Sequence, residues 1–346
     1  MEKINRQWFY SSPITGKMTT DNFAFREVAV PELRQGQVLV RNKLISMDPA
    51  CRTYFVMQNY LPQLQIGDVM ASFGIGEVVE SSDFRFQVGD IIHGNLGWQD
   101  YAVIDSFSRS EFIYKCTPGY SEEDLLGVLG VTGLTAYFGV QAVGKLKAGE
   151  TVVVGGATGA CGVIVGQLAK IADCRVIGFG GGKEKCQWLV DEIGFDAAID
   201  YSSPTVESDL AALCSDGIDF FSDAVGGVVT ASTIPLMKDG ARWYHYGNVS
   251  NYDTLVPGEL PTTHAGLNPA LFDLCRQKNI EPRLLVVFDH YCQRKNAEAE
   301  LGQHLRNGKL KAPTTIIDGF ENLPSALVNG TFGRKKYGKL NVRIAD

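Results

Sequence analysis

The amino-acid sequence predicts an α/β protein that combines a doubly wound parallel sheet with a second, mostly β domain. Three observations point to this fold class. Short β-branched runs separated by Gly and Asp turns occupy residues 25–114, strand and helix patterns alternate from residue 151 onward, and a glycine-rich turn joins the first of these later strands to a helix. The two parts differ in pattern, so we expect two cores.

The composition is that of a globular protein with room for two cores. The chain has 346 residues, of which 45% are hydrophobic and 21% are charged, and its net charge is −7. A negative chain has no long-range attraction for phosphate backbones or acidic lipid, so we expect neither nucleic acid nor a membrane among its partners. The opening segment MEKINRQWFY lacks the apolar core of a secretory signal, and we expect a cytoplasmic protein.

The cysteines and histidines form no pattern that is typical of a metal site. The 8 cysteines include no C-x-x-C pair, and the 5 histidines include no H-x-x-x-H spacing. We therefore expect reduced, mostly buried cysteines and no metal.

The mostly β region ends near residue 120. Within it, runs such as 38–40 and 77–79 alternate with glycine and aspartate turns. Ser121 is then followed by three acidic residues and a leucine-rich run, which is a helix start of the capping-box type. We place the domain junction here.

Strand and helix patterns alternate beyond residue 150. The expected strands are 151–154, 175–179 and 197–200, and the expected helices are 162–171 and 184–192. Later strands are expected near 220–221, 241–246 and 284–288. After Pro313 the tail becomes β-like again and ends in the run 340–344, which we expect to return to the first domain.

The turn after the strand at 151–154 carries a dinucleotide-binding pattern. Its sequence, GGATGACG over residues 155–162, stands between a strand and a helix, the context that a Rossmann fingerprint requires. Ala157 replaces the first glycine, whereas Gly159 lets the backbone approach a pyrophosphate and Gly162 lets helix and strand pack closely. The helix N-terminus offers free N–H groups to phosphates. The alternative is a glycine-rich turn without a ligand.

The residues after the second strand favour NADP over NAD. An NAD site usually has Asp or Glu there, about 20 residues after the fingerprint, to bind the ribose 2′-hydroxyl. Here the strand ends in the run FGGG at 179–182, and Lys183 and Lys185 follow. Two cations suit a 2′-phosphate, although lysines at a helix start are also common as solvated charges. Tyr201, after the next strand, is either a phosphate or ribose neighbour or a packing residue.

Further motifs lie in a specific order along the chain. They are SMDPACR at 46–52, FGIGEV at 73–78, VGD at 88–90, GLTAY at 133–137, GFDAAIDY at 194–201, GNVSNY at 247–252 and VFDHY at 287–291. Together with the glycine turn and residues 182–185, they resemble the zinc-independent prostaglandin reductase and alkenal double-bond reductase family of the medium-chain dehydrogenase/reductase superfamily. Each motif is weak alone, but their shared order is specific.

The resemblance implies a GroES-like catalytic domain formed by residues 1–120 and 313–346, and a Rossmann domain formed by residues 121–312, with the active cleft at their junction. It also implies NADP(H) as the cofactor and a homodimer. By motif match it assigns the cofactor contacts to Thr132, Gly159, Ala160, Cys161, Gly162, Lys185, Tyr201, Gly247, Val287 and Lys336. Of these, Lys185 and Tyr201 would bind the 2′-phosphate, with Lys336 near it.

By the same resemblance, Tyr252 matches the tyrosine that family members use to bond the substrate carbonyl or to supply a proton. A tyrosine with a pKa near 10 is protonated at pH 7 and donates without a metal. The alternative is an aromatic residue that only shapes the pocket. Ala50 and Ala224 depart from the family, which often has Tyr and Asn at these positions, and both changes bear on the choice of substrate.

The expected function is reduction, by NADPH, of the C=C bond of α,β-unsaturated ketones or aldehydes. A quinone or enoyl-thioester reductase and an NADPH-binding protein without turnover remain open, because these classes differ in the pocket and not in the fold.

Overall fold

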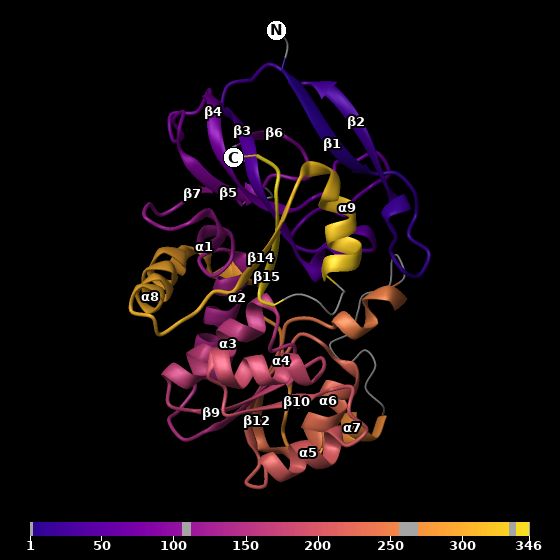
Figure 1. The fold of residues 1–346 in the computed structure, drawn as a ribbon, viewed down its shortest axis with the longest axis vertical. Helices are drawn as coiled ribbons and strands as arrows, with labels where there is room; N and C mark the ends of the chain where they lie inside the picture. Colours follow the sequence, from indigo (N-terminus) through magenta and orange to yellow (C-terminus); the bar gives the residue numbers. More distant parts are fainter. Residues whose placement is uncertain (1–2, 106–111, 256–268, 332–336, 346) are drawn as a thin grey trace.

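The computed structural model describes residues 3–105, 112–255, 269–331 and 337–345. The chain forms two bodies, one above the other (Figure 1). The upper body contains the first third of the chain and its last strands, and the lower body contains the middle of the chain.

The lower body is built on a six-stranded, fully parallel sheet. Its strand order is β10-β9-β8-β11-β12-β13. The strands are β8 (Thr151–Val154), β9 (Arg175–Gly180), β10 (Ala197–Asp200), β11 (Ile218–Asp223), β12 (Met237–His245) and β13 (Pro282–Arg283). With β8 taken as the first strand this is the Rossmann order 3-2-1-4-5-6, and the strand order reverses between β8 and β11.

Helices cover both faces of this sheet. They are α2 (Val131–Phe138), α3 (Ala160–Ile171), α4 (Lys183–Trp188), α5 (Val206–Leu213), α6 (Gly227–Thr233) and α7 (Pro269–Gln277), whereas α8 (Arg294–Arg306) packs on α2. All four residues of β8 are buried, and Val152 and Val154 pack into one hydrophobic cluster whereas Val153 packs into another. Because successive strand side chains face opposite sides, β8 has apolar packing on both faces, as parallel sheets require.

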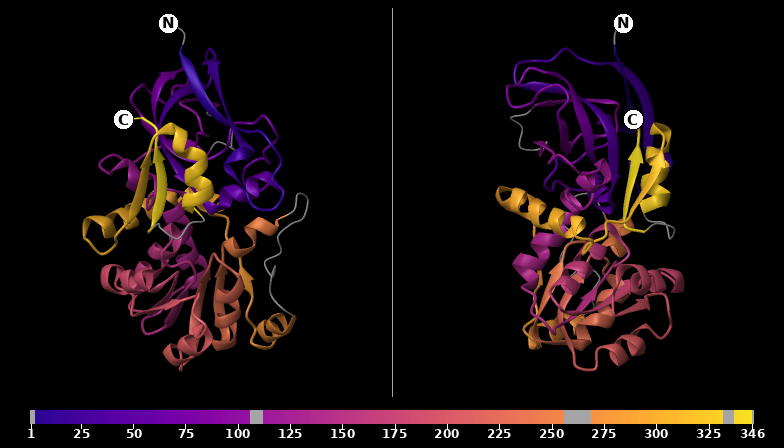
Figure 2. Two further views of the ribbon diagram at one scale, coloured as in Figure 1. Left: turned by 45° about the vertical axis from the view of Figure 1, so that its right-hand side comes forward. Right: turned by 60° about the vertical axis from the view of Figure 1, so that its left-hand side comes forward.

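The upper body contains a seven-stranded sheet in which the last strands of the chain lie beside strands from its first third (Figure 2). Its strands are β3 (Gln37–Met47), β4 (Phe73–Ser81), β5 (Ile91–Asn95), β6 (Tyr101–Asp105), β7 (Tyr114–Lys115), β14 (Thr314–Asp318) and β15 (Lys339–Arg343). β15 pairs antiparallel with β3 and parallel with β14. β1 (Ile4–Tyr10) and β2 (Phe23–Ala29) form a separate hairpin, and α1 (Glu122–Leu126) and α9 (Leu323–Ser325) complete the labelled elements.

The predicted fold class, a Rossmann sheet with a mostly β second domain, is confirmed. At the predicted helix start, the Ser121 hydroxyl accepts a hydrogen bond from the Asp124 N–H at 3.1 Å. The helix predicted at 162–171 begins two residues earlier, and the helix predicted at 184–192 is α4 continued by a π-helical turn at Leu189–Ile193.

The strand predicted at 284–288 is wrong. The last strand of the sheet is β13, and a 3₁₀ helix at Val287–Gln293 follows it. Phe288 stacks on Phe112 at a ring-centroid distance of 3.9 Å, so this apolar run packs against the upper body and not into the sheet. None of the helices in the described part of the chain combines the length and the apolar character needed to span a bilayer.

Candidate active site

The candidate site lies at the carboxyl ends of β8 and β11, the two strands between which the strand order reverses. β8 and β11 are neighbours, and where β8 ends the Gly155 N–H donates to the Ser222 carbonyl oxygen at 2.7 Å. In open parallel sheets, ligands bind outside the carboxyl ends of the strands at such a reversal. The glycine turn begins at this point, so the predicted fingerprint lies at the edge where a dinucleotide binds.

The glycine turn has the close packing that its sequence predicts. Gly156 has a φ of +65°, and a Cβ added to Gly162 would lie 2.4 Å from the Gly156 carbonyl oxygen. The departure at Ala157 is accommodated by Gly178 of β9, because a Cβ at Gly178 would lie 2.8 Å from the Ala157 Cβ. Gly159 is the N-cap of α3, which is 12 residues long. The turn therefore presents the N-terminus of α3 at the carboxyl edge of the sheet.

Lys185 and Tyr201 both border the end of β9. A Cβ added to Gly181 would lie 2.8 Å from the Tyr201 hydroxyl oxygen, and Lys185 lies in the first turn of α4, which begins after Gly182. The carboxylate of Asp200 is held by the Gly182 N–H at 3.0 Å and by Ser202. The structure thus brings the predicted 2′-phosphate residues together, whereas Lys336 lies outside the described residues.

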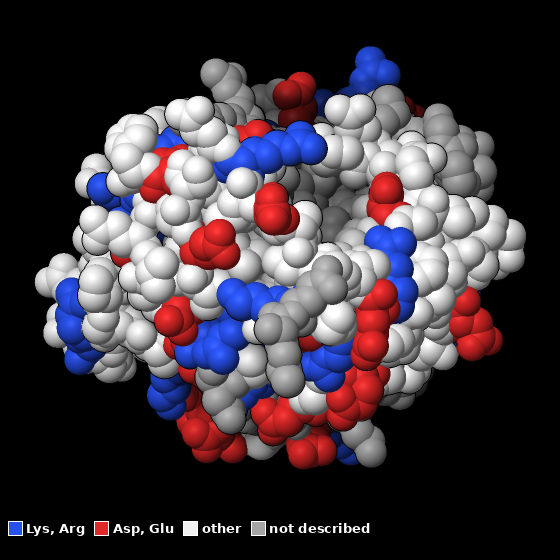
Figure 3. Space-filling view, turned by 90° about the horizontal axis from the view of Figure 1, so that it is seen from above, with Lys and Arg blue, Asp and Glu red and all other residues white. Residues whose placement is uncertain are grey.

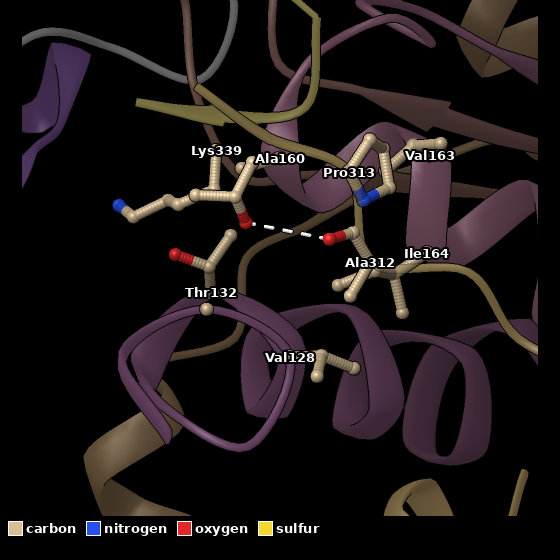
Figure 4. A pocket seen from close by; sticks show the side chains of 10 residues that line it. Val128, Thr132, Ala160, Val163, Ile164, Ala312, Pro313 and Lys339 are labelled. Carbon is tan, nitrogen blue, oxygen red and sulfur yellow. Dashed lines mark hydrogen bonds between the residues drawn. The ribbon is translucent and has the colours of Figure 1, made fainter. Parts of the chain in front are cut away.

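Thr132, Ala160 and Cys161 lie where α2 meets the first turn of α3. Thr132 and Ala160 line a small pocket between these helices (Figure 4). Burial raises the pKa of the Cys161 thiol to about 12. This cysteine is therefore a neutral thiol at pH 7, the less reactive form of a cysteine.

Tyr252 lies in a short 3₁₀ helix, Val249–Thr254, that follows β12. The helix is anchored on the turn after β11, because the Val249 N–H donates to the Ala224 carbonyl oxygen at 3.1 Å. Tyr252 is 9% exposed, and a Cβ added to Gly247 would lie 3.4 Å from its hydroxyl oxygen. The structure therefore brings the candidate proton donor beside a predicted cofactor residue.

Burial also fixes the protonation state of Tyr252. Burial raises the pKa of its phenol, although the Asn248 backbone N–H, which hydrogen-bonds to the phenolic oxygen, acts in the opposite direction. Within the described part of the chain, no acceptor receives the proton of this hydroxyl. A neutral phenol whose oxygen is held by a backbone donor is free to donate that proton to a ligand.

Aromatic side chains from both bodies meet next to Val287. The Phe288 ring lies 4.8 Å from that of Tyr60 and 5.6 Å from that of Phe73, in addition to its stack on Phe112. The Tyr60 hydroxyl lies 2.9 Å from that of Tyr54, and burial raises the pKa of the Tyr60 phenol, with the charge of an ionised Tyr252 acting in the same direction. The sequence offered no reason to single out Tyr54, Tyr60 or Phe112, because aromatic residues without a regular spacing form no recognisable pattern.

The cysteines, the possible metal ligands and the surface charges also bear on which cofactor the site could use. All eight cysteines are free, and the described residues include no group of three or more His, Cys, Asp or Glu side chains that could hold a metal ion. Acidic and basic side chains are interspersed on the face shown in Figure 3.

The fold and the site define a two-domain, dinucleotide-dependent oxidoreductase of the medium-chain dehydrogenase/reductase class. Two family models match the chain. One, described as the N-terminal domain of oxidoreductase, matches residues 6–111, and the other, described as zinc-binding dehydrogenase, matches residues 160–268.

Individual proteins are similar over nearly the whole chain. The NADPH-dependent curcumin reductase of Escherichia coli K12 is 35% identical and covers 99% of this chain and 97% of its own. The prostaglandin reductase 1 of Oryctolagus cuniculus is 30% identical, with coverages of 93% and 89%. The crystal structure of CurA from Vibrio vulnificus in complex with NADPH is 34% identical, covers 99% of both chains and has a TM-score of 0.88. The chain belongs to the zinc-independent family of curcumin, prostaglandin and alkenal reductases.

Proposed function

We propose that this protein is an NADPH-dependent reductase of the C=C bond of α,β-unsaturated ketones and aldehydes. The observation that carries the proposal is the buried Tyr252 hydroxyl beside Gly247, at the carboxyl edge of a Rossmann sheet. The names of the relatives support it, since they include an NADPH-dependent curcumin reductase and an NADP⁺-dependent 2-alkenal reductase from Nicotiana tabacum.

The residues present fit a phosphorylated dinucleotide. Gly162 leaves no room for a side chain, and the N-terminus of α3 supplies N–H donors for the diphosphate. Lys185 and Tyr201 would hold the 2′-phosphate at the end of β9, and Thr132, Gly247 and Val287 would line the remainder of the path. When bound, NADPH supplies the hydride that the β-carbon of the substrate accepts.

The chain contributes three things to this reaction. The Tyr252 hydroxyl donates a hydrogen bond to the carbonyl oxygen of the substrate, where negative charge builds as the enolate forms, and one such donor is worth about 3 kcal/mol. Its raised pKa keeps the phenol protonated, so the donor persists across neutral and mildly alkaline pH. The aromatic side chains around Phe288 exclude water and orient a flat, conjugated substrate.

We also infer that the protein is a homodimer in which β13 lies at the subunit interface. β13 is the edge strand of the parallel sheet, and Leu284 and Val286, just after it, are 61% and 37% exposed. Among the described residues no strand pairs with the outer edge of β13, and an edge flanked by exposed apolar side chains is a pairing surface. Light scattering coupled to size-exclusion chromatography measures the mass, and a monomer at micromolar concentration would contradict this inference.

The domain boundaries and the cellular location of the protein are likewise proposals. We propose domains at residues 1–120 with 313–346 and at residues 121–312, which agrees with the pairing of β15 with β3. A cytoplasmic location remains a prediction from the sequence.

Turnover assays test the proposed reaction. The purified protein is incubated with NADPH and, in separate reactions, with a simple enone, an alkenal, a quinone and a crotonyl thioester, while the absorbance of NADPH is followed. We expect consumption with the enone and the alkenal, and mass spectrometry should find the saturated carbonyl product. NADPH consumption with the quinone alone, or tight binding without consumption, would overturn the proposal.

A further inference from the structure

Lys339 is a buried cation at the place where the upper body meets the glycine turn. Its exposed fraction is 3%, and it is the first residue of β15. The residue before it, Gly338, forms an isolated parallel bridge with Gly159, and its N–H donates to the Thr158 carbonyl oxygen at 2.9 Å. The backbone that carries Lys339 is therefore hydrogen-bonded to the turn that would receive the diphosphate.

The ammonium group of Lys339 is held from the upper body. It donates to the carboxylate of Asp48 and to the hydroxyl of Ser46, and the Ser46 hydroxyl itself bonds to Asp48. Leu340 pairs with Met47 in the ladder between β15 and β3, so Lys339 and Asp48 are the next cross-strand pair. An ammonium has three N–H donors, and within the described residues the third has no acceptor.

The Lys339 side chain ends beside the predicted cofactor path. Lys339 lines the small pocket between α2 and α3 together with Thr132 and Ala160. Its ammonium and the Thr132 hydroxyl project to the same side of this pocket (Figure 4). Burial raises the pKa of Cys161, and the positive charge of Lys339 acts in the opposite direction. Two polar groups from different bodies thus converge at one end of the glycine turn.

We propose that Lys339 is a further cofactor-binding residue, and that the ammonium N–H without an acceptor among the described residues binds the part of the dinucleotide that NADPH and NADH share. This inference rests on the proposed position of the dinucleotide along the glycine turn. Lys185 and Tyr201 lie at the other end of that path, where only the 2′-phosphate distinguishes the two cofactors. Lys339 then sets affinity for the shared portion, and Lys185 sets the preference for NADPH.

The alternative is that Lys339 and Asp48 form only a structural ion pair. The two possibilities differ in the effect of removing each partner. If the pair is only structural, both substitutions weaken cofactor binding by disturbing the same place in the fold. Asp48→Asn then has at least as large an effect as Lys339→Gln, because it leaves the charge of Lys339, whose side chain is 4% exposed, whereas Lys339→Gln leaves that of Asp48, whose side chain is 26% exposed. A cofactor-binding lysine makes the two substitutions opposite in effect, because Asp48 repels the phosphates that Lys339 attracts. Asp48→Asn is therefore the matched control for Lys339→Gln.

The experiment measures dissociation constants by the quenching of protein fluorescence, for NADPH, for NADH and, by competition, for adenosine 2′-monophosphate. We expect Lys339→Gln to weaken NADPH and NADH by the same factor, about 10- to 100-fold, the range of a hydrogen bond to a charged group. Adenosine 2′-monophosphate should bind Lys339→Gln as it binds the wild type. Asp48→Asn should bind both dinucleotides at least as tightly as the wild type, and Lys185→Ala should weaken NADPH and adenosine 2′-monophosphate but not NADH.

Separate controls distinguish a variant that does not fold from a failure of the proposed reaction. If Lys339→Gln does not fold, the double variant Lys339→Gln with Asp48→Asn keeps a neutral hydrogen-bonded pair, and it should show the same loss of affinity for both dinucleotides. Unchanged dissociation constants in a folded variant, or a loss in Asp48→Asn at least as large as that in Lys339→Gln, would overturn the role of Lys339. A wild-type protein that binds NADPH but reduces no enone would instead overturn the proposed reaction and leave this test valid.

Discussion

Replacing Tyr252 by Phe removes the proposed proton donor and little else. The side chain is 9% exposed, and Phe keeps the ring in place, so only the hydroxyl is lost. A single donor to a developing oxyanion is worth about 3 kcal/mol, which corresponds to a fall in kcat of roughly 100-fold. The dissociation constant of NADPH should change by less than about twofold, because the hydroxyl acts on the substrate in the transition state. Stopped-flow measurement of single-turnover NADPH oxidation with an enone separates the two quantities.

The same substitution has a predictable cost in stability. The Asn248 N–H loses the phenolic oxygen as its acceptor, and an unsatisfied buried donor costs about 1–3 kcal/mol. In the wild type, burial raises the pKa of Tyr252, so its phenol stays neutral in the folded protein where an unfolded tyrosine ionises. Its contribution to stability is therefore complete below about pH 10 and is lost as the pH rises through the folded pKa.

A second buried tyrosine provides the matched control. The Tyr244 hydroxyl donates to the Thr135 carbonyl oxygen at 3.0 Å, on the side of β12 that packs against Gly139. Tyr244→Phe should lose about 1 kcal/mol of unfolding free energy in urea and keep the wild-type kcat. If Tyr252→Phe turns over the enone at the wild-type rate, Tyr252 has a packing role and the proposed mechanism is refuted.

Three further predictions concern other parts of the molecule. Lys185→Ala should raise the apparent KM for NADPH far more than that for NADH, and equal effects in steady-state assays would remove its link to the 2′-phosphate. Gly162→Ala places a Cβ 2.4 Å from the Gly156 carbonyl oxygen, so calorimetry should find NADPH binding weakened by about tenfold or more. Burial lowers the pKa of His93 from 6.5 to about 3, so stability should fall by about 2 kcal/mol between pH 8 and pH 5, where only the unfolded chain gains the proton. His93→Phe should flatten this pH dependence in urea unfolding, and an unchanged slope would contradict it.

Local sequence patterns were sufficient to predict much of the secondary structure of the lower body. The Rossmann strands β8 to β10 lie within one residue of the predicted ranges, because buried β-branched runs followed by amphipathic helices carry their own periodicity. The run at 284–288 shows the limit of this reasoning. Its apolar residues suit a strand, but Phe288 packs on Phe112 of the other body, and packing overrides local propensity.

The same distinction between local sequence patterns and tertiary contacts applies to the candidate site. The sequence alone determined the glycine turn and the cationic helix start after β9, because turn geometry, helix N-termini and close backbone approach depend on adjacent residues. Only the tertiary structure placed Tyr252 beside Gly247, gathered the aromatic side chains around Phe288 and paired Lys339 with Asp48. The aromatic cluster and the Lys339–Asp48 pair join residues that are far apart in the chain, and Tyr252, although close to Gly247 in sequence, is positioned by the contact of its 3₁₀ helix with the turn after β11. The geometry of the long-range contacts is set by how β15 closes the upper sheet and meets the lower body, which no local pattern encodes.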